Sequence, residues 1–232
     1  KWQRRWRITK HTQQEPSLKT KLVLFSGPFF VLLLAFIIHR LNSDLYGSIF
    51  GFDPQGAYGE WIQFICYSVA GVIGVATWRL LRKNGLNKEG VLIALFSIGC
   101  FFIALEEISY GQWIFKWETP ALFQEINTQG ETNLHNITGL MNIHLLFMVI
   151  GFFGGFAWVY KRISKGGLFT DLVCPEWHYA SYFFPVFVFY FYWDFIRPHF
   201  HIIGNQQELF ELILSFGFLL LSFLNYLLSV QV

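Results

Sequence analysis

The sequence predicts an all-α, polytopic membrane helix bundle with about six transmembrane helices, and three observations lead to this fold class. Of its 232 residues 54% are hydrophobic and 14% are charged, whereas soluble domains carry about 25% charged residues. Long apolar runs recur, each close to the roughly 20 residues that a membrane-spanning helix needs. Basic residues gather in alternate connections between these runs, as expected when the chain crosses a membrane repeatedly.

The apolar runs define the expected spans, taken in chain order. They cover about residues 22–41, 60–81, 91–110, 137–160, 179–196 and 208–230. In the fourth run Gly151 and Gly155 are four residues apart, a spacing that predicts a close helix contact. Ala70 and Gly74 do the same in the second run. Pro185 predicts a kink in the largely aromatic fifth run.

The connection between the third and fourth spans is expected to hold a short interfacial helix, inside an outer loop over residues 111–136. Thr119 and Pro120 form a favourable N-cap and first-turn pair. The helix that they start should end at about Asn127, and its apolar side chains should lie on the membrane surface. Glu208, Glu211, Ser215 and Ser222 share one side of the last span and should face the bundle.

The placement of charge sets the predicted topology. Fourteen of the 17 Lys and Arg residues fall on one side, and Arg40, Lys116 and Arg197 fall on the other. The positive-inside rule therefore places both termini in the cytoplasm. Residues 1–21 form a basic cytoplasmic juxtamembrane segment, and residues 22–232 form a single transmembrane helical domain. Membrane lipids are the expected partners of the basic segment, and nucleic acid is not expected to bind it.

Two adjacent carboxylates, Glu106 and Glu107, close the third span. Their side chains point about 100° apart on a helix, so one of them should face the bundle interior. A carboxylate removed from water needs a cation, a proton or a basic partner to offset its loss of hydration. The alternative is that both carboxylates remain in the hydrated interface.

The histidines near the fourth span divide by helical geometry. Glu131 and His135 would share a polar stripe with Thr138 and Asn142 if this segment is helical. His144 lies nine residues after His135 and so faces the opposite side of a straight helix. His144 could instead form a hydrogen bond with a neighbouring helix.

The connection between the fifth and sixth spans adds further candidate site residues. His199 and His201 alternate in an extended segment, a workable spacing for metal ligands. Asp194 either joins this site or pairs with Arg197 three residues later. The predicted catalytic residues are Glu106, Glu107 and Asp194. The predicted ligands of a divalent metal (Zn, Fe or Mn) are Glu131, His135, His199, His201 and His144.

Three segments of this region resemble a sequence signature. They are EEISYGQ at 106–112, ETP at 118–120 and INTQGETNLHN at 126–136. Together they resemble the signature of a group of uncharacterised bacterial multi-pass inner-membrane proteins, in which Trp is more frequent at the position of Tyr110. The resemblance implies a protein of the bacterial cytoplasmic membrane and supplies no activity.

Three functions fit these patterns. The first is a metal-dependent, membrane-embedded hydrolase or transferase that acts on a lipid or lipid-linked substrate from the extracytoplasmic side. The second is a non-catalytic accessory subunit of a larger membrane complex, whose other subunits bind its aromatic surfaces. A transporter or proton channel comes third, because the cytoplasmic halves of the spans carry few ionisable groups.

Overall fold

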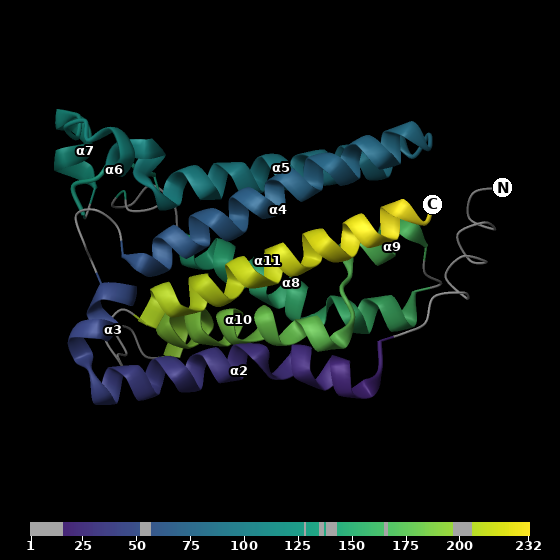
Figure 1. Cartoon of the computed structure of the whole chain (residues 1–232), viewed down its shortest axis with the longest axis horizontal. Coiled ribbons are helices and arrows are strands. Elements are labelled where there is room, and N and C mark those ends of the chain that lie inside the picture. The colour runs from purple at the N-terminus through teal and green to yellow at the C-terminus, as the bar shows by residue number, and fades with distance from the viewer. Residues whose placement is uncertain are drawn as a thin grey trace.

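The computed structural model describes residues 16–51, 57–127, 129–134, 137, 143–164, 167–196 and 206–232, and this part of the chain is helical (Figure 1). Its longer helices lie side by side along the long axis of the molecule. They are α2 (Leu18–Leu41), α4 (Tyr58–Lys83), α5 (Asn87–Glu107), α8 (Ile143–Ile163) and α11 (Gln206–Val230). The shorter helices are α3 (Ser43–Phe50), α6 (Gln112–Phe115), α7 (Ala121–Ile126), α9 (Leu168–Val173) and α10 (Phe184–Phe191).

Five helices, the longer ones just named, have the length and composition needed to cross a membrane. The expected fifth span is different, because its apolar helix covers only Phe184–Ile196. The segment Trp177–Tyr182 before it is a 3₁₀ helix, and Tyr192–Ile196 at its end is a π-helical turn. The expected kink at Pro185 is wrong, since this proline lies in the first turn of α10, where its missing N–H needs no partner.

Small side chains bring α4, α5 and α11 together in the centre of the bundle. The Ser222 hydroxyl of α11 donates to the carbonyl oxygen of Ala70 in α4 over 3.1 Å. An added Cβ at Gly74 of α4 would collide with the Ser97 hydroxyl of α5. Ser215 of α11 is completely buried. The predicted close contacts of α4 and the inward polar face of α11 are therefore confirmed.

A second close contact joins α8 to α10. A Cβ added to Gly151 would lie 2.6 Å from the backbone nitrogen of Phe187, so only glycine allows this approach. Gly155 faces the backbone of Phe184 in the same way. The predicted glycine face of the fourth span is confirmed, and its partner is the short aromatic helix.

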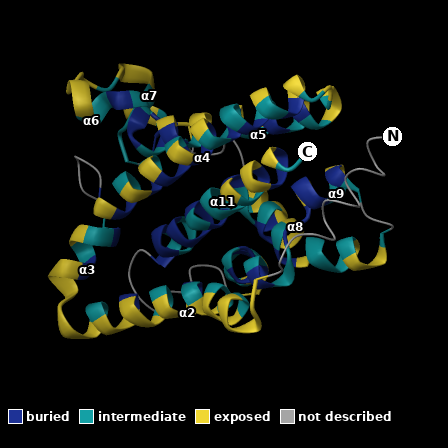
Figure 2. Cartoon of the chain, turned by 45° about the vertical axis from the view of Figure 1, so that its right-hand side comes forward, coloured by how far each residue is buried: buried dark blue, intermediate teal, exposed yellow. Residues whose placement is uncertain are grey.

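The remaining long helix, α2, covers one side of the bundle and buries little of itself. Pro28 and Ala35 are its buried residues, and exposed residues follow most of its length in Figure 2. Exposed apolar side chains on a spanning helix face lipid at no cost, because lipid tails are as apolar as leucine. The bundle therefore has a well-packed centre and a loosely attached flank at α2.

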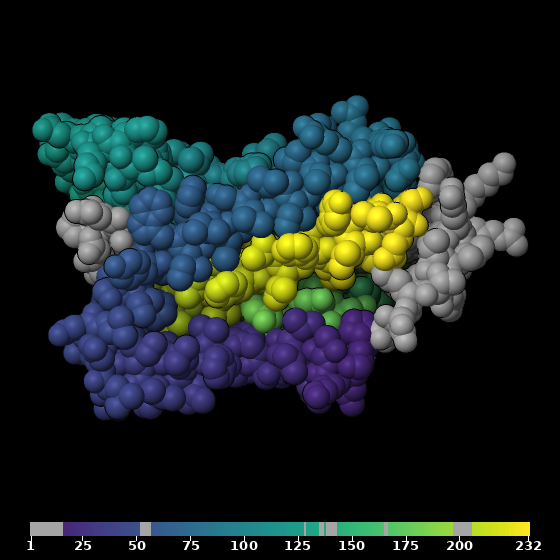
Figure 3. All heavy atoms as spheres, in the orientation of Figure 1, coloured from purple at the N-terminus to yellow at the C-terminus, as the bar shows by residue number. Residues whose placement is uncertain are grey.

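The two ends of the bundle differ in structure and charge. Helices α3, α6 and α7 form one end, called the loop end below, and α6 and α7 project from the body there (Figures 1 and 3). The opposite end carries the α4–α5 turn, α9 and the C-terminus. Its basic side chains include Arg82, Lys83 and Lys161, and Lys161 pairs with Asp171 over 3.1 Å.

Three local expectations at the loop end are wrong. The connection between the first two spans, residues 42–59, is expected to be a loop around Asp44, Asp53 and Pro54, but helix α3 occupies part of it. Thr119 does not cap α7, because its hydroxyl donates to the carbonyl oxygen of Gly130 instead. Ile137 is not the start of the fourth span, since it forms an isolated bridge with Asn127. Glu131 consequently lies in a loop, and the predicted helical stripe does not begin there.

Candidate functional site at the loop end

The first part of the site along the chain is a strained turn that directly follows α5. Ser109, Tyr110 and Gly111 have consecutive positive φ values of 47°, 55° and 92°. Non-glycine residues rarely adopt this conformation, and such strain persists only where surrounding contacts impose it. The Ser109 hydroxyl, fully buried, donates to Oε2 of Glu131 over 2.6 Å. The buried Asn133 side chain donates to the same carboxylate over 3.1 Å. Glu131 therefore holds the turn against the loop.

Amide side chains of the signature segments lock the rest of the loop. Asn127 donates to the carbonyl oxygen and to Oδ1 of Asn133, and it accepts from the backbone N–H groups of Gln129 and Glu131. Gln112 accepts from the backbone N–H of Thr132 over 2.8 Å. Residues far apart in the signature thus form one hydrogen-bonded unit, called the loop network below.

Glu106 belongs to the same network. Its Oε2 accepts from the backbone N–H of Leu134 over 2.8 Å, and its side chain is 5% exposed. Burial, together with a hydrogen bond to Glu106, raises the pKa of the Tyr110 phenol above its ordinary range. Glu106 and Glu131, both predicted as site residues, are engaged in positioning the loop.

Glu107 faces another direction, as the one-residue offset on a helix predicts. Glu211 and Glu208 of α11 and Glu60 of α4 lie within electrostatic range of Glu107. We call these four residues the carboxylate cluster. Glu211 accepts a hydrogen bond from the Tyr190 hydroxyl over 2.5 Å.

A histidine–aspartate pair lies beside this cluster. Nδ1 of His144, in the first turn of α8, is 2.9 Å from Oδ1 of Asp194. This contact joins residues 50 positions apart in the sequence, and Arg197, the alternative partner of Asp194, lies outside the described residues. The Tyr190 ring packs on the His144 ring at 4.8 Å. Tyr190 therefore contacts both the carboxylate cluster and the pair.

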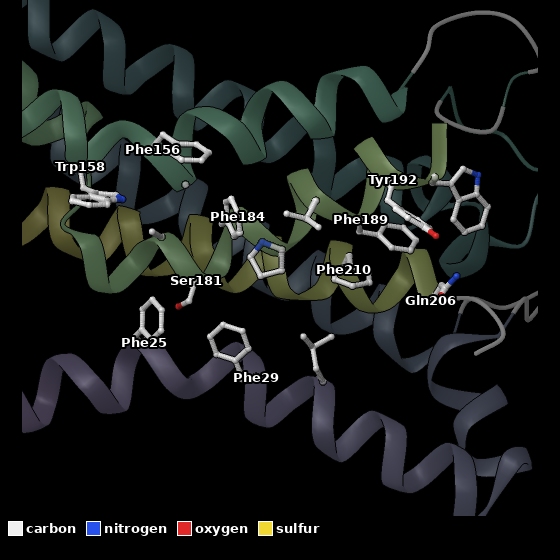
Figure 4. Close-up of a pocket in the computed structure, with 16 residues that line it drawn as sticks. Phe25, Phe29, Phe156, Trp158, Ser181, Phe184, Phe189, Tyr192, Gln206 and Phe210 are labelled. Atoms are coloured by element: carbon white, nitrogen blue, oxygen red, sulfur yellow. The ribbon is translucent and has the colours of Figure 1, made fainter. Parts of the chain in front are cut away.

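An apolar cavity of about 690 Å³ adjoins the pair. Trp193 lines the cavity, and its ring also meets the His144 ring edge-on at 6.2 Å. In Figure 4 the labelled lining residues run from Phe25, Trp158 and Ser181 at one end to Tyr192 and Gln206 at the other. Tyr192 and Trp193 directly precede Asp194, so this end of the cavity lies near the pair, whose two residues do not themselves line it.

The structure brings together part of the predicted site. His144 and Asp194 form a pair, and Tyr190 connects this pair to Glu211 of the carboxylate cluster. His135, His199 and His201 lie outside the described residues. In the described ranges no three His, Cys, Asp or Glu side chains are grouped so that they could hold a metal ion. Glu60 and Tyr190 were not predicted. The signal for Tyr190 was its place one turn before Asp194 on a helical segment.

No protein-family model, curated protein or solved structure significantly matches the chain.

Proposed function

We propose that the protein is a membrane-embedded hydrolase or transferase that acts on a lipid or lipid-linked substrate at the loop end. The observation that carries this proposal is the His144–Asp194 pair, 2.9 Å apart, at the end of an apolar cavity. A reaction site needs a titratable group with fixed orientation beside a space for substrate. The pair and the cavity supply these two features, and the carboxylate cluster lies next to them.

The pair suits acid–base chemistry. A carboxylate on Nδ1 fixes the imidazole so that Nε2 carries the lone pair, and it stabilises the imidazolium that forms when Nε2 takes a proton. The His144 and Asp194 side chains are 28% and 18% exposed, so a reacting hydroxyl or water can reach them. Oδ2 of Asp194 is buried and has no hydrogen-bond partner among the described residues.

The same geometry suits a metal ligand. Metal-bound histidines commonly donate their second ring N–H to a carboxylate, as His144 can to Asp194. As the alternative to a free general base at Nε2, we propose a divalent ion (Zn, Fe or Mn) bound by Nε2 of His144 and by the predicted ligands His135, His199 and His201, because a bound ion takes the lone pair that proton transfer needs. Glu131 would then orient the loop rather than bind the ion, because Ser109 and Asn133 already occupy its Oε2. Elemental analysis of the purified protein tests this part.

The proposed location is the bacterial cytoplasmic membrane, with the site on its extracytoplasmic side. Basic side chains surround the end opposite the site, where Arg82, Lys83 and Arg162 lie at helix termini. Arg40 and Lys116 are the basic residues of the loop end in the described ranges. This asymmetry supports a cytoplasmic position for the basic end.

The test is lipid turnover by the full chain in vesicles of phosphatidylethanolamine, phosphatidylglycerol and cardiolipin, followed by mass spectrometry. We expect His144→Gln and Asp194→Asn to lower turnover by about 10²–10⁴-fold, the usual contribution of a general acid or base. His39→Gln, a change at the loop end away from the pair, serves as the control. Equal turnover in all three variants would show that the pair has no catalytic part.

A second candidate function is an accessory subunit of a larger membrane complex. The observation that favours it is the exposed apolar surface of the projecting loop, where Phe115 is 72% and Leu122 is 63% exposed. Such a surface fits either the bilayer interface or another subunit. A stoichiometric partner that is retained by the wild type and lost from Phe115→Ser, with no lipid turnover, would favour this function over the enzyme.

A further inference from the structure

The cavity has a shape and composition suited to one hydrocarbon chain. It lies among α2, α8, α10 and α11, and its lining is almost wholly apolar (Figure 4). Three of these four helices are candidate membrane spans, so the cavity lies at the depth of lipid tails. An apolar space at that depth excludes water, because water needs several polar partners to enter. Only an apolar group can fill it.

The cavity volume limits the occupant. The volume of about 690 Å³ is large enough to admit a hydrocarbon chain. The volume also falls inside the range of about 300–1,000 Å³ that is typical of ligand sites. A protein segment would need hydrogen-bond partners for its backbone, which these walls do not offer.

Polar groups lie at both ends of the cavity. Gln206 and Tyr192 lie at the end near Asp194, whereas Ser181 lies at the far end with Phe25 and Trp158. The proximity of the His144–Asp194 pair favours the first end for the lipid headgroup. Tyrosine and tryptophan at such a boundary present one apolar and one polar edge, which suits the junction of a lipid tail and its headgroup. The loosely packed helix α2 forms one wall of the cavity, and a lipid acyl chain can enter from the bilayer past this helix.

We infer that the cavity binds one acyl chain of a membrane glycerophospholipid, with the first bonds of that chain held at Gln206 and the His144–Asp194 pair. The binding of the acyl chain is inferred from the cavity alone. That the bound lipid is also the substrate rests on the proposed function. The substrate class of the site is then a phospholipid that is bound through a single chain.

Native mass spectrometry tests this inference on the full chain extracted from vesicles of palmitoyl-oleoyl-phosphatidylglycerol. Val188→Trp would fill the cavity from α10, where Val188 is 44% exposed. Val149→Trp is the matched control, because Val149 is 43% exposed on α8 and does not line the cavity. Leu32→Trp fills the cavity from the opposite wall, so the test does not depend on the folding of one variant.

We expect wild type and Val149→Trp to keep one lipid at collision energies that remove peripheral lipid, and Val188→Trp and Leu32→Trp to lose it. A wild type that keeps no lipid, or filled variants that keep as much as wild type, would overturn the inference. Asp194→Asn separates the two proposals. Retained lipid with lost turnover in this variant supports both the binding site and the catalytic pair. Retained lipid with unchanged turnover supports the binding site and refutes the catalytic pair, whereas turnover by a wild type that retains no lipid refutes the binding site alone.

Discussion

Replacement of Asn127 by alanine tests whether the loop network opens as one unit. The side chain makes four hydrogen bonds, two donated to Asn133 and two accepted from the N–H groups of Gln129 and Glu131. A typical intramolecular hydrogen bond contributes about 1 kcal/mol, and a buried group left without a partner costs about 1–3 kcal/mol. Gln129 and Glu131 can regain water because they are partly exposed, but Asn133 is 1% exposed and cannot.

The expected cost of Asn127→Ala is therefore about 2–4 kcal/mol for opening the loop. The informative probe is the backbone amide of Thr132, which is bonded to Gln112 and not to Asn127. If the network is cooperative, native-state hydrogen exchange at Thr132 should accelerate by about 30- to 1,000-fold, because each 1.4 kcal/mol corresponds to a factor of ten.

Gln124→Ala is the control, since this exposed side chain makes one hydrogen bond, to the carbonyl oxygen of Thr119. It should leave exchange at Thr132 nearly unchanged. Faster exchange at Gln129 and Glu131 in Asn127→Ala, with no change at Thr132, would refute the cooperative network. The four bonds would then be independent local contacts.

Three further changes test other features. Tyr46→Phe should leave stability unchanged or raise it by up to about 2 kcal/mol, because the buried Tyr46 hydroxyl has no partner among the described residues. Burial raises the pKa of Tyr46 from 10.0 to about 12, so its contribution to stability is full below pH 10 and is lost as pH rises to about 12. Gly151→Ala should destabilise the α8–α10 contact by about 1–3 kcal/mol. Glu107→Gln should change lipid turnover without changing exchange in the loop, whereas Glu106→Ala should speed loop exchange.

Each of these has a direct readout. Denaturation across pH 10 to 12 should show a larger loss of stability in the wild type than in Tyr46→Phe, because Tyr110 and other tyrosines with a raised pKa remain in both proteins. Gly99→Ala, where an added Cβ meets nothing within 4 Å, is the thermal-unfolding control for Gly151→Ala. An equal loss of stability in the two glycine variants would contradict the packing argument. Loop exchange that accelerates equally in the two glutamate variants would contradict the separation of their roles.

The long helices were predictable because a span is a local property of about 20 residues. The apolar runs and small-residue spacings of α4, α8 and α11 were sufficient to predict them, and the structure confirms these contacts. The short helix α10 was not predictable in this way. Its aromatic run is long enough to span a membrane, but Pro185 lies at the start of a new helix that follows a 3₁₀ segment. A proline can either kink one continuous helix or begin a new one, and local composition does not determine which of these occurs.

The site was predictable as a region but not as a set of contacts. Helical periodicity correctly predicted that Glu106 and Glu107 face different directions. It could not predict the pairing of His144 with Asp194, because 50 residues separate them and only the packing of α8 on α10 joins them. Periodicity also misplaced Glu131, since a helix was assumed where Asn127 and Ile137 pair.

The polar residues of the signature therefore have two roles, to hold the loop and to join the carboxylate cluster. The turn that follows α5 determines which residue has which role. The positive-φ residues Ser109 to Gly111 turn the chain back, which lets Glu106 and Glu131 bind backbone and amide groups of the loop. Glu107, one residue along, remains on the inner side of α5 and meets the carboxylate cluster. The loop network thus fixes the C-terminal turn of α5, and with it the position of Glu107. Disturbance of the network should consequently affect turnover through the position of Glu107.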